Sequence, residues 1–107
     1  MSMTIIEVTQ KNIDDTLKTS GTVVLDFWAN SCGPCKQLST TLESIRDQQT
    51  DINHITVAKI RIDTEFALAK RFKVRSSPTL ILFKNGEEIA RKNNQWDNNS
   101  VLEFIRG

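Results

Sequence analysis

The chain has two cysteines, Cys32 and Cys35, which lie three residues apart around Gly33 and Pro34. Sulfur atoms at this spacing can meet across one helical turn. Such a pair can open and close as a redox dithiol, supply half of a metal site, or form a permanent structural crosslink. The rest of the sequence must distinguish these three kinds of chemistry.

The length of the chain and its first residues argue against a permanent crosslink. A chain of 107 residues buries about two-thirds of its unfolded surface and needs no disulfide for stability. The first ten residues, MSMTIIEVTQ, contain no basic region followed by an apolar core, so they do not resemble a secretory signal. We therefore expect a cytoplasmic protein, and thiols in the cytoplasm are kept reduced.

The charge balance argues against two classes of partner. The chain has 14 Lys and Arg residues against 13 Asp and Glu residues, which gives a net charge of +1. Surfaces that bind nucleic acids or membranes usually carry a strong positive excess, so we expect neither partner. The longest apolar runs, such as LILF, are far too short to cross a bilayer.

A metal site would need more ligands than the sequence offers. Structural zinc is bound by about four side chains, whereas the chain has these two cysteines and one histidine, His54. His54 lies in the polar run TDINH before an expected strand, where a solvated loop residue is the simpler interpretation. A site shared between two chains remains an alternative, but we expect no bound metal.

Strand-like and helical runs alternate along the chain without a linker or repeat, which predicts a single domain over residues 1–107. The runs rich in β-branched or aromatic residues predict strands at residues 5–8, 23–29, 55–63, 79–84 and 87–92. Asn85 and Gly86 between the last two strands predict an antiparallel hairpin. The pattern therefore predicts an α/β fold with a mixed sheet and helices on both faces.

The helix that follows Cys32 gives the two sulfur atoms different surroundings. One apolar stripe recurs at spacings of three and four: Cys35, Leu38, Leu42 and Ile45. Pro34 lacks an N–H group and suits the first turn of a helix, which places Cys32 at the open N-terminus. The helix dipole favours a thiolate there. We expect Cys32 to attack a partner's disulfide and Cys35 to resolve the mixed disulfide.

Two charged residues interrupt strands that should otherwise be buried. Asp26 lies in the run VVLDFWA, six residues before Cys32, and burial would raise the pKa of its carboxyl group. Such a group could take the proton from Cys35 through water as that thiol attacks. Lys59 in VAKIRID could place its ammonium group near Asp26. The alternatives are a strand-end aspartate that meets solvent and an ordinary surface lysine.

The motifs DFWA, CGPCK, VAKIRID, SPTLILFKNGE and LEFI together resemble the thioredoxin family over essentially the whole chain. The resemblance implies the thioredoxin fold, a central mixed sheet of about five strands flanked by four helices. It also implies a protein-disulfide reductase and electron carrier that uses no cofactor besides the Cys32–Cys35 disulfide. The implied partners are disulfide-containing proteins and a thioredoxin reductase, usually linked to NADPH. We expect the protein to be a monomer.

The resemblance also assigns roles to residues around the dithiol. Pro78 matches the family's cis-proline, which faces the cysteines and lets the backbone of Ser77 pair with a substrate strand. Only about 5% of X-Pro bonds are cis, so this expectation rests on the resemblance alone. Asp26 and Lys59 match the family's buried acid and its neighbouring lysine, and Trp28 matches the aromatic residue beside the active site.

Three residues around the dithiol differ from the usual pattern of the family. Ser31 stands where a tryptophan commonly precedes the first cysteine, and Ser77 stands where a branched aliphatic residue commonly precedes the proline. Asn94 replaces a usual glycine, although asparagine tolerates the left-handed backbone that such a loop can require. All three positions border the docking surface. We therefore expect the thiol chemistry to be retained and the range of substrates to be narrower.

Two other functions are compatible with the same fold. The protein could be a binding module or scaffold in which the dithiol is incidental, or an oxidant that forms disulfides in other proteins. Gly33 and Pro34 between the cysteines argue against the oxidant, because oxidants of this family usually carry other dipeptides and are exported.

Overall fold

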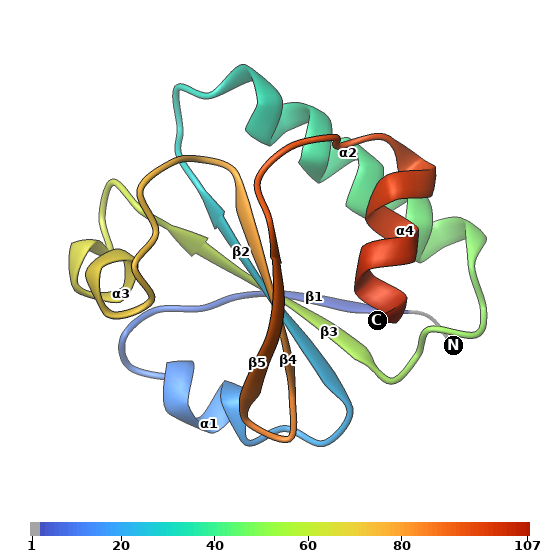
Figure 1. Cartoon of the computed structure of the whole chain (residues 1–107), viewed down its shortest axis with the longest axis horizontal. Helices are drawn as coiled ribbons and strands as arrows, with labels where there is room; N and C mark the ends of the chain where they lie inside the picture. Colours follow the sequence, from blue (N-terminus) through green and yellow to red (C-terminus); the bar gives the residue numbers. More distant parts are fainter. Residues whose placement is uncertain (1–2) are drawn as a thin grey trace.

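Strands and helices alternate along the chain and end with a hairpin and a helix, as the sequence predicted (Figure 1). The computed structural model describes residues 3–107; the predicted domain also includes residues 1 and 2, which lie outside this range. The elements are β1 (Thr4–Glu7), α1 (Ile13–Leu17), β2 (Thr22–Trp28), α2 (Gly33–Gln48), β3 (Ile55–Arg61), α3 (Phe66–Arg71), β4 (Thr79–Lys84), β5 (Glu87–Lys92) and α4 (Asn98–Arg106). The predicted strands are present, with ends that differ by two residues at most.

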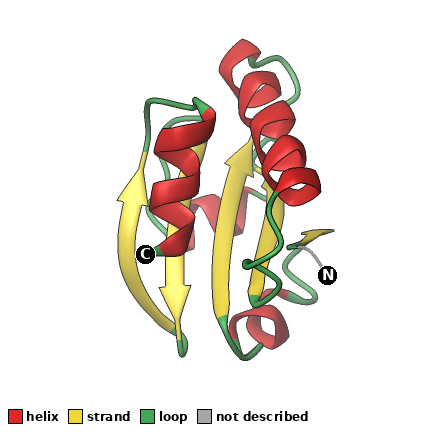
Figure 2. Ribbon diagram, turned by 90° about the vertical axis from the view of Figure 1, so that its right-hand side faces the viewer, coloured by secondary structure: helices red, strands yellow, loops and turns green. Residues whose placement is uncertain are grey.

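The strands form one mixed sheet in the order β1-β3-β2-β4-β5. β3 is parallel to both β1 and β2, whereas β4 is antiparallel to β2 and to β5. Helices cover both faces of the sheet, and in Figure 2 α2 and α4 lie together in front of it. β2 lies at the centre of the sheet, which explains why every residue from Thr22 to Phe27 is buried.

Two hydrophobic clusters hold the helices against opposite faces of the sheet. On one face, α2 and α4 contribute apolar side chains at helical spacing: Leu38, Leu42, Ile45, Val101 and Ile105. On the other face, Phe72 after α3 packs against Phe27 and Phe83, with both pairs of ring centroids 5.9 Å apart. Each fully buried leucine stabilises the fold by about 2 kcal/mol. The sheet therefore fixes α2, and with it the position of the helix N-terminus.

The hairpin between β4 and β5 turns through Asn85 and Gly86, which confirms the prediction from the sequence. Both residues have positive φ angles, 54° and 79°, as a two-residue type I′ turn requires. Lys92 at the end of β5 pairs with Leu80 near the start of β4. The loop that follows β5 therefore returns beside the segment that precedes β4.

That loop is also fastened to α2. Trp96 in the loop is buried within the core, and its carbonyl oxygen accepts a hydrogen bond from the Thr41 hydroxyl group at 2.7 Å. Asp97 caps the N-terminus of α4 by accepting a hydrogen bond from the N–H group of Ser100 at 3.1 Å. These contacts hold the loop that carries Asn94 close to α2.

We predict that Gly21→Ala destabilises the protein more than Gly86→Ala does. Both glycines have positive φ angles, 89° and 79°, which cost an alanine about 1 kcal/mol. A methyl group at Gly21 would also collide with the carbonyl group of His54. That carbonyl group accepts a hydrogen bond from the N–H group of Thr22, so it cannot move freely. A methyl group at Gly86 would have no atom within 4 Å.

Urea unfolding measures this difference. The free energy of unfolding should fall by about 1 kcal/mol for Gly86→Ala and by about 3 kcal/mol for Gly21→Ala, because overpacking adds to the backbone cost. An equal decrease in the free energy of unfolding for the two variants would mean that Gly21 and His54 are not in tight contact.

Candidate active site

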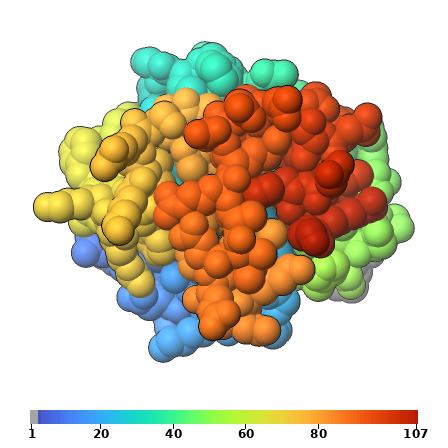
Figure 3. Space-filling model, viewed as in Figure 1, coloured from blue at the N-terminus to red at the C-terminus, as the bar shows by residue number. Residues whose placement is uncertain are grey.

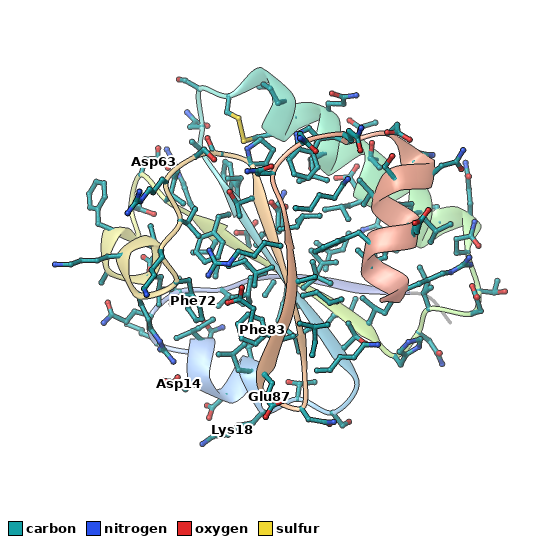
Figure 4. The ribbon with its side chains drawn as sticks, viewed as in Figure 1. Asp14, Lys18, Asp63, Phe72, Phe83 and Glu87 are labelled. Carbon is teal, nitrogen blue, oxygen red and sulfur yellow. A yellow bond between two sulfur atoms is a disulfide. The ribbon has the colours of Figure 1, made fainter. Side chains whose placement is uncertain are left out.

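The disulfide between Cys32 and Cys35 lies at the N-terminus of α2, where Figure 4 shows its yellow sulfur bond. Cys32 is the N-cap residue, with an extended backbone (φ −144°, ψ 106°), and its sulfur atom accepts a hydrogen bond from the N–H group of Cys35 at 3.1 Å. Pro34 occupies the first turn, where its missing N–H group leaves no hydrogen bond unmade. The predicted start of this helix is confirmed.

The two cysteines differ in exposure, as their positions on the helix predicted. Cys35 is buried, with 6% of its surface exposed, because it begins the apolar stripe of α2. Cys32 is half-buried, and its neighbours Ser31, Gly33 and Pro34 are exposed. A group from a partner protein can therefore approach Cys32 from solvent, whereas Cys35 is covered by the helix and the sheet.

The segment before β4 lies directly against the Cys32 sulfur atom. The carbonyl oxygen and the hydroxyl oxygen of Ser77 are each 3.7 Å from that sulfur. The Ser77–Pro78 bond is cis, as the resemblance implied, and Pro78 is buried. The Thr79 hydroxyl group donates a hydrogen bond to the Ser76 carbonyl oxygen at 2.8 Å, which holds the segment in this shape. Ser77, Pro78 and Cys32 are thus brought together as the sequence suggested.

Asp26 is buried in β2, with 2% of its surface exposed, so the alternative of a strand-end aspartate in solvent is wrong. Burial raises the pKa of its carboxyl group to about 7; the Lys59 ammonium group acts against this increase, and Glu7 adds to it. One carboxyl oxygen, Oδ1, has no hydrogen-bond partner among the described residues. The group can therefore gain or lose a proton near neutral pH.

Lys59 lies opposite Asp26 in the strand register, so both side chains lie on the same face of the sheet. Its ammonium group donates a hydrogen bond to the Ser39 hydroxyl oxygen at 3.3 Å and lies 5.3 Å from the centre of the Trp28 ring. Lys59 is only half-buried, but these contacts hold it in place, so it is not an ordinary surface lysine. Glu7 on β1 also pairs with Lys59, which places three charged residues in one row across the sheet.

Ser39 is the residue of this site that sequence reasoning missed. It lies four residues after Cys35 on α2, and therefore on the same side of the helix. A polar residue at this spacing, beside the apolar stripe, was the available signal. Its partner could not be identified from the pattern, because Lys59 lies on a strand 20 residues away in sequence.

Trp28 forms one wall of a pocket behind Cys35. The pocket has a volume of about 130 Å³ and is lined by Trp28, Asn30, Cys35, Lys36, Ser39 and Lys59. The indole ring also faces the Arg61 guanidinium group, whose central carbon is 5.6 Å from the ring centre, and its N–H group has no partner among the described residues. The lining is mainly apolar, although it includes the polar groups of Lys36, Ser39 and Lys59, and the volume exceeds that of a water molecule several-fold.

Asn94 lies apart from the cysteines in the contacts that the structure gives. It is exposed in the loop between β5 and α4, and no hydrogen bond described here joins it to Cys32 or Cys35. The left-handed residue of this loop is its neighbour Gln95, with φ of 61°. Asn94 itself does not use the left-handed backbone that asparagine tolerates, and its side chain is exposed to solvent.

The described residues contain no cluster typical of a metal centre. Within residues 3–107 no group of three or more His, Cys, Asp and Glu side chains gathers as metal ligands do. His54 is exposed in the turn before β3, where its carbonyl group accepts the hydrogen bond from Thr22. None of the helices described, α1 to α4, has the length and apolar character needed to cross a membrane.

Comparison with known proteins identifies the family. A family model described as Thioredoxin matches residues 4–107. The chain belongs to the thioredoxin family. A thioredoxin from Chlamydia trachomatis serovar D is 40% identical over 98 residues, which cover 92% of each chain. The solved structure of a mutant thioredoxin from Halobacterium salinarum has a TM-score of 0.84 at 33% identity and covers 96% of this chain and 88% of its own.

A further relative is named for two activities in one chain. It is a bifunctional thioredoxin reductase/thioredoxin from Mycobacterium leprae, 44% identical over 87 residues, which cover 80% of this chain and 19% of that protein.

Thioredoxin-family membership and the Cys32–Cys35 disulfide together establish the reaction class. Thioredoxins are thiol–disulfide oxidoreductases, and this protein is a thioredoxin-type disulfide reductase. The family uses no cofactor beyond its redox-active disulfide. The thioredoxin fold expected from the sequence, a mixed sheet of five strands with four helices, is confirmed.

We predict that Asp26→Ala stabilises the protein above pH 7 but not below pH 4. The carboxyl pKa is about 7 in the folded protein, against 3.8 for an unburied aspartate. Between these values the folded state holds a proton that the unfolded state has released, so the wild-type protein loses stability as the pH rises. This loss is on the order of 4 kcal/mol above pH 7, and the variant does not have it.

Urea unfolding at several pH values tests this linkage. After a cavity cost of about 1 kcal/mol, Asp26→Ala should be about 3 kcal/mol more stable than the wild type above pH 7 and about 1 kcal/mol less stable below pH 4, where only the cavity cost remains. A stability difference between variant and wild type that is the same at both ends of the range would show that Asp26 ionises normally.

Proposed function

We propose that the protein reduces disulfide bonds in partner proteins, with Cys32 as the attacking residue and Cys35 as the resolving residue. The observation that carries this assignment is the position of the two sulfur atoms on α2. The Cys32 sulfur caps an open helix end, while Cys35 is buried one turn into the helix. A helix N-terminus stabilises a thiolate, so the accessible sulfur is also the more reactive one.

The reaction proceeds by two exchanges between sulfur atoms. The Cys32 thiolate attacks one sulfur of the partner's disulfide, forms a mixed disulfide, and releases the partner's other sulfur as a thiolate. Cys35 then loses its proton, and its thiolate attacks the Cys32 sulfur. This step breaks the mixed disulfide, releases the partner's second thiolate, and forms the Cys32–Cys35 disulfide, the state present in this structure. Two electrons pass to the partner.

Asp26 accepts the proton that Cys35 must lose before it attacks. A carboxyl group with a pKa of about 7 is well matched to general base catalysis at neutral pH. The pocket that borders Cys35 and Lys59 is large enough to hold water, which supports transfer of the proton through a water molecule. Lys59 supports this role because its ammonium charge lowers the pKa of Asp26 and so keeps part of the group ionised.

Partner proteins dock on the surface around Cys32. Ser77 borders the sulfur directly, and the cis bond to Pro78 sets the direction in which the backbone of Ser77 faces an extended segment of the partner. We propose that this docking surface also includes Trp28, Ser31, Gly33 and Pro34 near the helix end, with the exposed Asn94 at its outer edge. A tryptophan can bury on the order of 150 to 250 Å² in a contact, so the small polar Ser31 and Ser77 weaken general docking. We propose a narrower range of substrates than that of a typical thioredoxin.

A thioredoxin reductase returns the oxidised protein to its dithiol form. The Mycobacterium leprae relative, whose name combines a thioredoxin reductase with a thioredoxin, supports such a pairing. We further propose that the chain is one domain and acts as a cytoplasmic monomer, without a metal, nucleic acid or membrane partner. The near balance of charge supports the last part of this proposal.

Reduction of insulin with a thioredoxin reductase as the electron source tests the proposed function. Cys32→Ser should abolish turnover, because the attacking thiolate is absent. Cys35→Ser should also lose turnover but should accumulate a covalent adduct with insulin, since only the resolving thiol is missing.

Electrophoresis without reductant separates the two variants. An adduct on Cys32→Ser and none on Cys35→Ser would reverse the two roles. Normal insulin turnover by both variants would rule out a dithiol mechanism. Inactivity of the wild-type protein toward both insulin and a small disulfide in the presence of chemical reductant would overturn the proposed function itself.

A further inference from the structure

A second hollow is formed by residues on both sides of the Ser77–Pro78 segment in sequence, none of which lines the pocket behind Cys35. It has a volume of about 170 Å³, and its lining includes Lys73, Arg75, Ser76, Thr79, Arg91 and Asn93. Three of these six side chains are cationic, and none is acidic. Figure 3 shows the gold atoms of the segment before β4 beside the orange atoms of β5, the two parts of the chain that form this hollow. We call it the basic hollow.

Two of its three positive charges are not neutralised by the protein. Arg91 forms an ion pair with Glu88 at 2.6 Å and also donates a hydrogen bond to the Phe72 carbonyl oxygen at 2.6 Å. Arg91 therefore fixes the backbone that leads to Lys73. Lys73 and Arg75 are exposed, and neither has an acidic partner within 4.0 Å among the described residues.

The basic hollow begins next to the reactive sulfur atom. Ser77 contacts the Cys32 sulfur, and the neighbouring Ser76 and Thr79 line the hollow. Successive residues of an extended chain are about 3.3 Å apart, so a side chain two residues from the partner's target cysteine lies about 7 Å from it. A partner segment that pairs with Ser77 and runs along the residues before it would bring that side chain toward Arg75, two residues before Ser77, at the hollow that Lys73 also lines.

We infer that the basic hollow selects partner proteins that carry Asp or Glu within about two residues of the target cysteine. This inference rests on the proposed function, because it names a class of substrate for the same site. A carboxylate in the hollow would meet two unpaired cations, whereas a lysine or arginine would be repelled by them. The chain as a whole has a net charge of only +1, so the attraction is local to this surface.

The charge at the hollow also complements the polar surface around Cys32. Ser31 and Ser77 offer little apolar area to a partner, so docking depends more on the charged side chains beside them. A partner segment with acidic side chains near its disulfide therefore binds better than a purely apolar segment, because its carboxylates contact the cations of the hollow.

Peptides of matched sequence test this inference. Three peptides share one internal disulfide and differ in the residues two positions from the target cysteine, which are Asp, Ser or Lys. At low salt, the reduced protein should reduce the Asp peptide with a kcat/KM about tenfold higher than that for the Lys peptide. The Ser peptide should lie between them, and high salt should bring the three values together.

Charge reversal locates the effect in the basic hollow. The double variant Lys73→Glu with Arg75→Glu should reverse the preference. The matched control, Lys11→Glu with Lys18→Glu, changes the net charge equally but keeps the preference, because these exposed lysines lie by α1; Figure 4 labels Lys18 at the opposite end of the molecule from the disulfide. Both variants should reduce a small uncharged disulfide at the wild-type rate.

Each other outcome has a definite meaning. Equal kcat/KM values for the Asp and Lys peptides at low salt would overturn the inference, and so would equal changes in the preference by both double variants. If no peptide or small disulfide is reduced at all, the proposed function fails, and the substrate preference fails with it.

Discussion

The site depends on one hydrogen bond, from the N–H group of Cys35 to the sulfur atom of Cys32 at 3.1 Å. This bond makes Cys32 the N-cap of α2 and places Cys35 one turn into the helix. A helix N-terminus leaves N–H groups without partners and therefore favours negative charge. The same turn exposes one sulfur atom and buries the other. The start of α2 therefore makes the two sulfur atoms different, and the proposed roles of Cys32 and Cys35 depend on this difference.

The sheet determines how that helix end meets its partners. β2 leads from Asp26 in the core to Trp28 beside the site, and β4 begins directly after Pro78. These two strands are neighbours and antiparallel, so the end of one lies beside the start of the other, and Ser77 comes against Cys32. Burying Asp26 in this central strand reduces stability above pH 7, and in the proposed mechanism the same carboxyl group accepts the proton of Cys35. Under that mechanism, stability and function oppose each other at Asp26.

Much of the fold and half of the site could be predicted because their causes are local in sequence. Helical spacing predicted that Cys35 is buried, and Asn85 with Gly86 predicted the hairpin. The contacts of Ser39 with Lys59 and of Arg91 with Phe72 join residues that are far apart in sequence, so no local pattern contains them. Phe66 is 72% exposed, although an apolar side chain in a helical pattern would be expected to face the core. The short helix α3 covers the sheet with Leu68 instead.

Selective alkylation of the reduced protein tests the central claim most directly. Brief treatment with iodoacetamide at neutral pH, followed by mass mapping of the labelled peptides, compares the two sulfur atoms in one sample. The account predicts that Cys32 is labelled first and that Cys35 is labelled only after the protein is unfolded, because α2 exposes one thiol as a thiolate and buries the other. Equal labelling of both cysteines in the folded protein, or faster labelling of Cys35, would contradict it.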